Sequence, residues 1–289
     1  MNKIPILLLA FNRLDTLKEV FSEIISYAPD FLMISIDGPR PGVPGEEAMV
    51  KEVETYLKNR ITWQCDVVWL VSENNKGCGR AVSDAIDCFF ERVDFGIILE
   101  DDCKPRQEFF LFCEQNRMIR HSISDIGCIS GTRFKAIGKR FKVNHLSYFP
   151  MIWGWATWSD VWEQHRKRRD RENDGASIKP SFVKKNYLKV KQGLVDTWDY
   201  QWIFSFYSYN KKSLVPSCSL VENIGFDSDK STHTRSDKSR LIDYSENCAF
   251  SSVEIVHRID PYYEWSLKHI IFRDNFFWKT VRFLKKKKC

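Results

Sequence analysis

Three acidic residues, Glu100, Asp101 and Asp102, directly follow the apolar run Ile97–Leu99. Burying an unpaired carboxylate is costly, so three of them at the end of a strand require solvent, a cation or both. Open α/β sheets bind ligands at the carboxyl ends of their strands, where divalent cations that bridge phosphates use one or two carboxylates. The triplet therefore predicts a cation and phosphate site. A solvated acidic turn is the alternative interpretation.

Polar residues also follow the other strands that the sequence predicts. Apolar runs at 4–10, 31–36, 67–71 and 95–99 indicate four strands, and they lead into Asn12 and Arg13, Asp37, the segment 72–76 and the triplet. Because the carboxyl ends of parallel strands share one edge of a sheet, we expect these residues to converge. The alternatives are local: Asn12 caps the following helix, and Asp37 with Gly38 forms a turn.

The residue types at this edge suit a nucleotide. Asp37 can accept N–H groups from a base or bind ribose hydroxyls, and Arg13, Lys76 and Arg80 supply positive charge for a diphosphate. The loop Gly77–Gly79 can let backbone amides approach a phosphate at the start of a helix. It is neither a Walker motif nor a full dinucleotide fingerprint, so its signal is weak alone.

The order of the expected elements predicts the fold class. Helical spacing over 14–25, 46–58 and from the Gly77–Gly79 loop to about 93 alternates with the four strands. Such alternation indicates an α/β protein with a mostly parallel sheet flanked by helices. Further along, we expect a helix around Phe109–Met118 and a strand at 126–129, and the segment 224–240 reads as a mobile loop. We predict one domain over 1–260 and an appendage over 261–289.

The nine cysteines are odd in number and show no C-x-x-C spacing. This pattern argues against a structural zinc site and against a disulfide framework. Reduced thiols in a cytoplasmic protein are the simplest interpretation. We find no signal peptide, and no apolar run is long enough to span a bilayer.

Positive charge gathers near the end of the chain. The protein has 44 Lys and Arg and 38 Asp and Glu, of which eight basic residues and one acidic residue lie in 268–288. The remainder is close to neutral, so no nucleic-acid partner is expected. Apolar residues in the same stretch fall near one helical stripe: Leu267, Ile270, Ile271, Phe277, Trp278, Val281 and Leu284. This pattern predicts a basic amphipathic helix at a membrane surface, the alternative being a stripe that packs on the domain.

Several of these motifs resemble one family. Leu9–Arg13, Asp37 and Ile98–Asp102 resemble glycosyltransferases of the GT-A fold. The segment Phe149–Trp155, continued by Trp158 and Trp162, is similar to the inverting β-N-acetylglucosaminyltransferases that begin complex N-glycan branches (the N-acetylglucosaminyltransferase I family). Bacterial sugar transferases of surface-polysaccharide clusters share the set. The resemblance covers roughly residues 4–225 and implies a GT-A (Rossmann-like) fold.

The resemblance implies roles for the nucleotide-binding residues. Asp102 would coordinate Mn²⁺ or Mg²⁺ bridging the diphosphate. Glu100 and Asp101 would hold the ribose and the donor sugar. Asp37 would bind the uracil, with Arg13 and Arg80 near the nucleotide.

The resemblance also implies roles on the acceptor side. Trp198-Asp199 with Trp202 is similar to the segment that carries the catalytic base, so Asp199 would be the general base. Asp196 is its main competitor, and a helix-capping role is open for either. Trp153 and Trp155 would form a sugar platform, the alternative being core aromatics. His233 would cover the diphosphate from a loop.

The expected function is an inverting, metal-dependent glycosyltransferase that uses a UDP-sugar, such as UDP-N-acetylglucosamine. Its acceptor would be a surface glycan on a lipid carrier or a lipopolysaccharide core, with the protein peripheral on the inner face of the plasma membrane. The eukaryotic relatives carry a luminal anchor that we do not find here, so donor and acceptor identities do not transfer.

Two other functions remain open. The first is a sugar-phosphate nucleotidyltransferase, which the loop Phe11–Leu14 disfavours because it contains no glycine. The second is an inactive relative that binds a nucleotide or a glycan.

Overall fold

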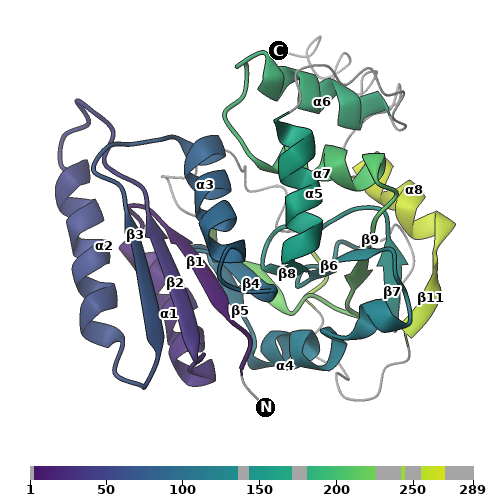
Figure 1. Cartoon of the computed structure of the whole chain (residues 1–289), viewed down its shortest axis with the longest axis horizontal. Coiled ribbons are helices and arrows are strands. Elements are labelled where there is room, and N and C mark those ends of the chain that lie inside the picture. Colours follow the sequence, from purple (N-terminus) through teal and green to yellow (C-terminus); the bar gives the residue numbers. More distant parts are fainter. Residues whose placement is uncertain (1–2, 136–142, 171–180, 226–241, 245–254, 271–289) are drawn as a thin grey trace, which may run out of the picture.

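In the described part of the chain, the strands form a nine-stranded sheet with helices on both faces (Figure 1). The computed structural model describes residues 3–135, 143–170, 181–225, 242–244 and 255–270. The strand order is β11-β7-β9-β6-β8-β4-β1-β2-β3, and most neighbouring pairs are parallel. The predicted fold class, a mostly parallel sheet flanked by helices, is confirmed.

The four predicted strands form one half of this sheet. They are β1 (Ile6–Ala10), β2 (Phe31–Ile36), β3 (Asp66–Val71) and β4 (Phe95–Glu100). All are parallel, in the order β4-β1-β2-β3. Every residue of β1 is buried, as expected for a parallel strand covered on both faces.

The other half of the sheet mixes directions. It consists of β6 (Ile126–Ser130), β7 (Asn144–Ser147), β8 (Trp155–Trp158), β9 (Lys212–Val215) and β11 (Ile255–Ile259). β8 is antiparallel to both β4 and β6, and so joins the two halves. The strand β5 (Cys103–Pro105) directly follows the acidic triplet. It forms a separate antiparallel pair with β10 (Val221–Asn223).

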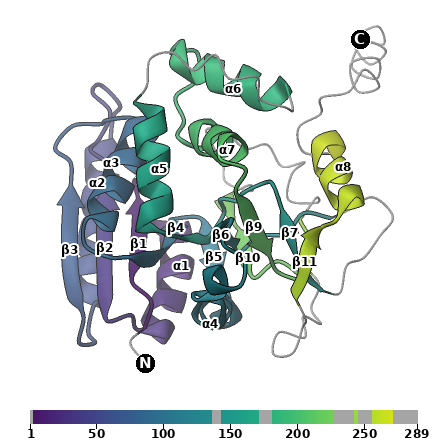
Figure 2. The same ribbon diagram turned by 45° about the vertical axis from the view of Figure 1, so that its right-hand side comes forward.

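Two groups of helices cover the sheet. The helices are α1 (Leu14–Tyr27), α2 (Glu46–Arg60), α3 (Cys78–Phe90), α4 (Gln107–Asn116), α5 (Ser159–Arg169), α6 (Ser181–Lys191), α7 (Asp199–Ser208) and α8 (Pro261–Ile270), with a short 3₁₀ turn η1 (Ile119–His121). α1 contacts α2 and α4, whereas α5 contacts α3 and α7. Figures 1 and 2 show these groups on opposite faces of the sheet, with α3, α5 and α7 together.

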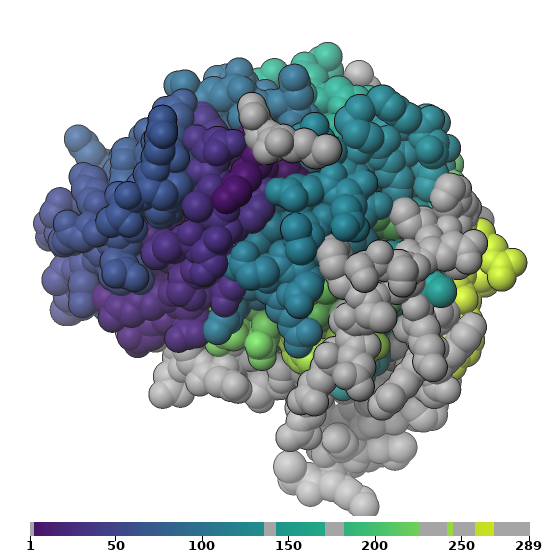
Figure 3. Space-filling view, turned by 90° about the horizontal axis from the view of Figure 1, so that it is seen from below, coloured from purple at the N-terminus to yellow at the C-terminus, as the bar shows by residue number. Residues whose placement is uncertain are grey.

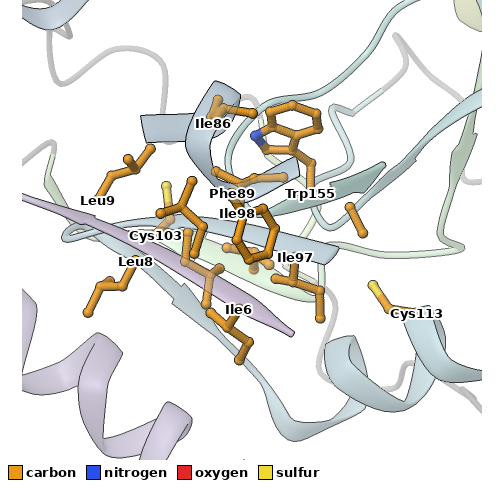
Figure 4. Close-up of a cluster of buried hydrophobic side chains, with 14 of the residues drawn as sticks. Ile6, Leu8, Leu9, Ile86, Phe89, Ile97, Ile98, Cys103, Cys113 and Trp155 are labelled. Carbon is orange, nitrogen blue, oxygen red and sulfur yellow. The ribbon is translucent and has the colours of Figure 1, made fainter. Parts of the chain in front are cut away.

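The core lies between β1, β4 and the helices on either side (Figure 4). Ile6, Leu8 and Ile97 are fully buried on one face of the sheet, whereas Ile98 lies on the other face with Phe89 of α3 and Trp155 of β8. Burial of this kind contributes roughly 25 cal/mol per Å² of apolar surface, so the core holds the strands in register. The carboxyl ends of β1 and β4 are thereby fixed.

The C-terminal appendage begins as α8, which packs on a second hydrophobic cluster. Tyr263 and Leu267 of α8 are 0% and 2% exposed in that cluster. Leu267 therefore faces the domain, so the predicted membrane-facing stripe is wrong at this residue, while residues 271–289 lie outside the described part of the chain. No helix in the described residues is long and apolar enough to cross a membrane.

The cysteines differ in one respect from the prediction. Cys65, Cys78, Cys88, Cys103, Cys113 and Cys128 are free thiols. Cys218 is disulfide-bonded, so the interpretation that all thiols are reduced is wrong at this position.

Candidate functional site

The carboxyl ends of β1 and β4 lie side by side. Leu9 of β1 pairs with Glu100 of β4, so the segment Phe11–Arg13 leaves the sheet next to Asp101 and Asp102. Both aspartates are almost fully buried, at 3% and 6% exposed. The sequence prediction that these residues converge holds for the first and fourth strands.

Arg13 binds two of the three carboxylates. Its Nη1 donates to Asp102 Oδ2 at 2.7 Å, and its Nη2 donates to Asp101 Oδ1. The backbone N–H of Phe11 donates to the other oxygen of Asp101 at 3.2 Å. Burial opposes the charge on Arg13, but Asp101 and Asp102 outweigh it and raise the pKa of the guanidinium above its ordinary value. Arg13 thus serves as the counter-cation of the acidic pair.

The triplet still carries more negative charge than Arg13 neutralises. Burial, followed by the neighbouring Asp102 carboxylate, raises the pKa of Glu100 above its ordinary value. The pKa of Asp101 is also raised, by burial first, although Arg13 acts in the opposite direction. Shifts of this sign mean that ionised carboxylates lack enough compensating positive charge, which is a recurrent property of functional sites.

The donor set fits a hard divalent cation in chemical type. Asp101 and Asp102 offer carboxylate oxygens, and Mg²⁺ commonly uses one or two carboxylates together with substrate phosphates and water. In the part of the chain that is described, no three His, Cys, Asp or Glu side chains are grouped so that they alone could hold a metal. Arg13 occupies the cation position between the two aspartates, so a metal would have to share or replace its contacts.

A segment from the other end of the domain closes over Asp102. The backbone N–H of Ile224 donates to the Asp102 carbonyl at 2.8 Å. Gly225 lies so close that an added Cβ would come within 2.2 Å of Asp102 Oδ2. The Asp102 carboxylate can therefore occupy this position only because Gly225 has no side chain. His233, with most of the loop predicted over 224–240, lies outside the described residues.

Asp37 organises the loop after β3. Its Oδ1 accepts the N–H groups of Gly38 and Lys76, both at 2.9 Å, and its Oδ2 accepts Asn75 Nδ2 at 2.9 Å. Burial raises its pKa, although these backbone N–H groups act to lower it. Asp37 therefore connects the end of β2 to the loop that precedes α3. Its bond to the Gly38 N–H agrees with the turn that was the alternative interpretation of the sequence.

Asn12 binds a residue that sequence reasoning missed. Its Nδ2 donates to Glu46 Oε1 at 2.9 Å. Glu46 is only 2% exposed and also accepts the backbone N–H of Arg40 at 2.7 Å and the Arg40 side chain. The Arg40 guanidinium lies 5.7 Å from the centre of the Phe11 ring. This network fixes the loop after β1 from the side of α2.

Lys76, in the loop before α3, and Arg80, on α3, lie on an exposed surface. Their side chains pair with Asp84, at 3.3 and 3.7 Å. Arg80 is highly exposed, and pairs of this kind contribute little to stability. Both cations therefore remain accessible to an anionic ligand, but neither contacts the acidic triplet in this structure.

The start of α7 meets the start of α3. Asp199, the first residue of α7, accepts Thr197 Oγ1 and the backbone N–H of Tyr200 at its Oδ1, the latter at 2.8 Å. Asp196 Oδ1 accepts the backbone N–H of Gly79 at 2.9 Å. The structure thus brings both candidate bases to the Gly77–Gly79 loop.

Cys78 is the second residue that sequence reasoning missed. Cys78 keeps an exposed surface, yet its neighbours desolvate the thiol, and this desolvation together with the charges of Glu100, Asp196 and Asp199 raises its pKa. The same charges show that the α3 and α7 starts lie near the triplet. Neither Cys78 nor Glu46 carries a sequence signal, since a lone cysteine or a helical glutamate is common.

The two tryptophans of the proposed sugar platform differ. Trp155 is fully buried and stacks on Trp198 with ring centroids 5.6 Å apart. It is a core residue, so the prediction that it contacts a sugar is wrong in this structure. Trp153 is only partly buried, with its ring 5.4 Å from that of Phe134, and its platform role stays a prediction.

A cavity of about 500 Å³ lies at the amino-terminal ends of the parallel strands, opposite the acidic triplet. It is lined by residues at the amino ends of the strands, including Ile4, Phe31, Asp66 and Phe95, together with Met118 and Trp158. Figure 3 views the molecule from this end, where the purple residues that lead into β1 reach the surface. None of the predicted site residues lines this cavity, and the chemistry described above belongs to the other edge.

Comparisons with known proteins give no family assignment. No protein-family model and no curated protein matches the chain. Among solved structures, HddC from Yersinia pseudotuberculosis, also solved with GMP-PN, is similar over 63% of this chain and 86% of its own, with a TM-score of 0.34 and 11% identity.

Two further solved structures carry reaction names. The 4-diphosphocytidyl-2C-methyl-D-erythritol synthase from Anaerococcus prevotii covers 73% of this chain and 88% of its own (TM-score 0.34, 8% identity). The inositol-1-phosphate CTP transferase from T. maritima covers 74% and 86% (TM-score 0.39, 8% identity).

These neighbours correct the enzyme class expected from the sequence. The two neighbours with reaction names are a 4-diphosphocytidyl-2C-methyl-D-erythritol synthase and an inositol-1-phosphate CTP transferase, and neither is a glycosyltransferase. The prediction that the protein is a glycosyltransferase is wrong on this finding. The TM-scores below 0.5 add nothing about mechanism, which has to be argued from the site.

Proposed function

We propose that the protein is a divalent-cation-dependent transferase that acts on a nucleotide at the carboxyl ends of β1, β2 and β4. The observation that carries the proposal is the group of three carboxyl groups, Glu100, Asp101 and Asp102, that shares the single guanidinium of Arg13. Such a group attracts a second cation, and a nucleotide phosphate chain is a ligand that brings one.

For the reaction we propose transfer of a nucleotidyl group from a nucleoside triphosphate to a sugar phosphate. A phosphate oxygen of the sugar phosphate attacks the α-phosphorus, the bond from the α-phosphorus to the bridging oxygen breaks, and pyrophosphate leaves. Bound Mg²⁺ or Mn²⁺ would neutralise charge on the phosphates and act as a template. Asp102 and Asp101 are the carboxylates that would hold the ion.

The contacts of Asp199 support this reaction type. Transfer to a sugar hydroxyl needs a general base, whereas a phosphate nucleophile is already largely ionised near neutral pH. Oδ1 of Asp199 is engaged within the first turn of α7, where it accepts Thr197 Oγ1 and the Tyr200 N–H. A reaction that requires no base is compatible with that arrangement.

The loop Phe11–Leu14 has no glycine, so side chains would supply the positive charge for the triphosphate. Arg13 lies at the triplet, Lys76 is exposed in the loop before α3, and Arg80 is exposed on α3. Their weak pairing with Asp84 leaves them able to bind phosphate instead. Asp37 and the loop it organises would lie next to the nucleoside.

The experiment offers the purified protein CTP, GTP, UTP or ATP with a panel of sugar phosphates. Pyrophosphate release is measured with Mg²⁺, with Mn²⁺ and with EDTA. We expect release only when a nucleotide, a sugar phosphate and a cation are all present, and we expect Asp102→Asn to abolish it. Asp66→Asn, at the opposite edge of the sheet, is the matched control.

Two outcomes would overturn the proposal at different levels. If no nucleotide binds in the presence of Mg²⁺ or Mn²⁺, measured by calorimetry, the site is not a nucleotide site. If nucleotides bind but a nucleotide sugar releases its nucleoside diphosphate while no pair of substrates yields pyrophosphate, the proposed reaction is wrong although the site is real.

A further inference from the structure

The carboxylate of Asp196 occupies the space beside two glycines at the start of α3. Its Oδ1 accepts the Gly79 N–H at 2.9 Å. A Cβ added to Gly77 would lie 2.5 Å from Asp196 Oδ2, and one added to Gly79 would lie 2.7 Å from Oδ1. Real Cβ atoms do not come so close to other heavy atoms, so a side chain at either position would force the Asp196 carboxylate to move. Gly77 also has a positive φ of 80°, which glycine adopts without strain.

This contact joins two segments that are far apart in the sequence. Gly79 and Asp196 are separated by 117 residues, and Asp196 comes three residues before Asp199, the first residue of α7. An acidic group next to a helix N-terminus is favourable, because the first N–H groups of the helix have no partner within it. Asp196 therefore fastens the start of α7 to the start of α3.

Both joined segments lie within electrostatic range of Glu100. Cys78, between the two glycines, experiences the charges of Glu100 and Asp199. A change in the contact between Asp196 and Gly79 would shift both helix starts relative to Glu100.

We propose that Asp196 is a positioning residue, which holds the starts of α3 and α7 at the geometry that the transfer reaction needs. The inference rests on the proposed function, since it assigns a role in turnover. It predicts that loss of Asp196 affects the catalytic step more than nucleotide binding. Misplacing reacting groups by about 1 Å can slow a reaction by roughly 100-fold.

The test compares four variants in the pyrophosphate assay. Asp196→Ala should lower kcat by roughly 10- to 100-fold with little change in the KM for the nucleotide. Asp196→Asn should restore most of kcat, because its amide oxygen still accepts the Gly79 N–H. Gly79→Ala should be as impaired as Asp196→Ala or more, because its Cβ collides with the carboxylate.

The double variant Gly79→Ala with Asp196→Ala gives the sharpest result. Removing the carboxylate makes room for the new Cβ, so the double variant should turn over at least as fast as Gly79→Ala alone. Asp66→Ala, on β3 at the far edge, is the control for loss of an exposed aspartate. If the two substitutions are simply additive, or if Asp196→Asn is as impaired as Asp196→Ala, the positioning role is wrong.

Failure of the inference can be separated from failure of the proposed function. If the wild-type protein never releases pyrophosphate, the proposed function fails, and the contact is then judged by hydrogen exchange. In that case the amides at 78–81 should exchange faster in Asp196→Ala than in the wild type. If they do not, or if an active wild type and Asp196→Ala share the same kcat, the inference is overturned.

Discussion

Arg13 and Asp102, 89 residues apart in the sequence, form an ion pair of 2.7 Å at the carboxyl edge of the sheet. The parallel pairing of β1 with β4 makes this contact possible, because it brings the end of one strand beside the end of the other. Arg13 binds Asp101 through its second nitrogen, so one guanidinium bridges two carboxylates. Arg13 is therefore a fixed cation in a site whose acidic residues favour a second cation.

Removal of Arg13 should destabilise the protein in a cation-dependent way. Arg13→Ala leaves Asp101 and Asp102 buried without a counter-charge, a change that typically costs about 3 kcal/mol or more. We expect that loss in urea unfolding with EDTA, and a partial recovery with millimolar Mg²⁺ or Mn²⁺, since the ion can replace the lost charge. Wild-type protein should respond less to the same ions.

The control for Arg13 is an exposed cation in a surface pair. Lys51 binds Glu54 at 2.8 Å on α2 with most of its side chain in solvent. Lys51→Ala should change the unfolding free energy little, with or without the cation. Equal responses of the two variants to Mg²⁺ would contradict a cation site at the triplet.

Gly225→Ala should weaken cation-dependent nucleotide binding without removing any charge. The new Cβ would lie 2.2 Å from Asp102 Oδ2, so the carboxylate must move. Loss of one charge-assisted contact corresponds to about tenfold or more in affinity. Calorimetry with CTP or GTP, with Mg²⁺ and with EDTA, measures the change. An effect that is the same in EDTA would assign the loss to folding rather than to Asp102.

Sequence patterns predicted the part of the fold where each strand is a continuous apolar run. β1, β2 and β4 are buried on both faces, so Leu8, Ile34 and Ile98 belong to unbroken hydrophobic segments. Their parallel arrangement then follows from the intervening helices, and the convergence of Arg13 with the triplet follows from the arrangement.

The second half of the sheet could not be predicted in the same way. β7, β8 and β9 are four residues long and pair with strands that are distant in the sequence. Short strands carry little periodic signal, and their pairing is decided by tertiary packing. β8 illustrates this, because Trp155 and Trp158 lie in a segment that reads as an aromatic surface, whereas Trp155 packs against Trp162 of α5 and Trp202 of α7.

Side-chain direction limited the prediction of the site. Lys76 and Arg80 follow the correct strand, yet their side chains turn to Asp84 along α3. The charge of Asp199 acts on Glu100, yet its Oδ1 accepts the N–H of its neighbour Tyr200. The position of a residue after a predicted strand indicates at which end of the sheet it lies. It does not indicate which side chain it contacts.

The protein should lose stability below about pH 6.5 because of a buried histidine. His165 is 1% exposed and bonds Ser205 at 2.8 Å, and burial lowers its pKa to about 3. In the unfolded chain the imidazole takes up a proton near its ordinary pKa of about 6.5, while the folded form stays neutral. Stability is therefore full above about pH 6.5 and falls as the pH decreases, by about 2 kcal/mol at about pH 5 for this group.

His165→Asn separates this contribution from other acid effects. Urea unfolding between about pH 4.5 and 7.5, the range over which the histidine titrates in the unfolded chain, should show a shallower decline for the variant than for the wild type. The matched control is His121→Asn, on the exposed η1 turn, which should leave the slope unchanged. An unchanged slope for His165→Asn would assign the acid sensitivity to other groups.

The tryptophans next to Gly154 should separate stability from substrate contact. Trp155 is surrounded by Trp162, Trp198 and Trp202, so Trp155→Ala should lower the unfolding free energy by about 3–5 kcal/mol. Trp153→Ala, at a partly buried position, should cost less stability. If Trp153 contacts the sugar, its replacement should raise the KM for the sugar phosphate while nucleotide affinity stays the same.

The basic end of the chain should bind anionic lipid surfaces. Residues 271–289 contain seven Lys and Arg, five aromatic residues and one acid, and four of the lysines are consecutive at Lys285–Lys288. Each basic residue near an anionic leaflet contributes about 1 kcal/mol, so replacing these four with Gln should weaken binding by roughly three orders of magnitude. The measurement is co-sedimentation of the full chain with phosphatidylcholine vesicles, with and without about 30% phosphatidylglycerol, a fraction that gives a strong negative surface potential.

The control is the double variant Arg166→Gln with Lys167→Gln, which removes two charges from the surface of α5 and should bind as the wild type does. Because the attraction is electrostatic, binding should also decline as salt is added. Equal binding to neutral and anionic vesicles would contradict the proposed role of the lysines, and no binding to either would remove the membrane from the list of partners.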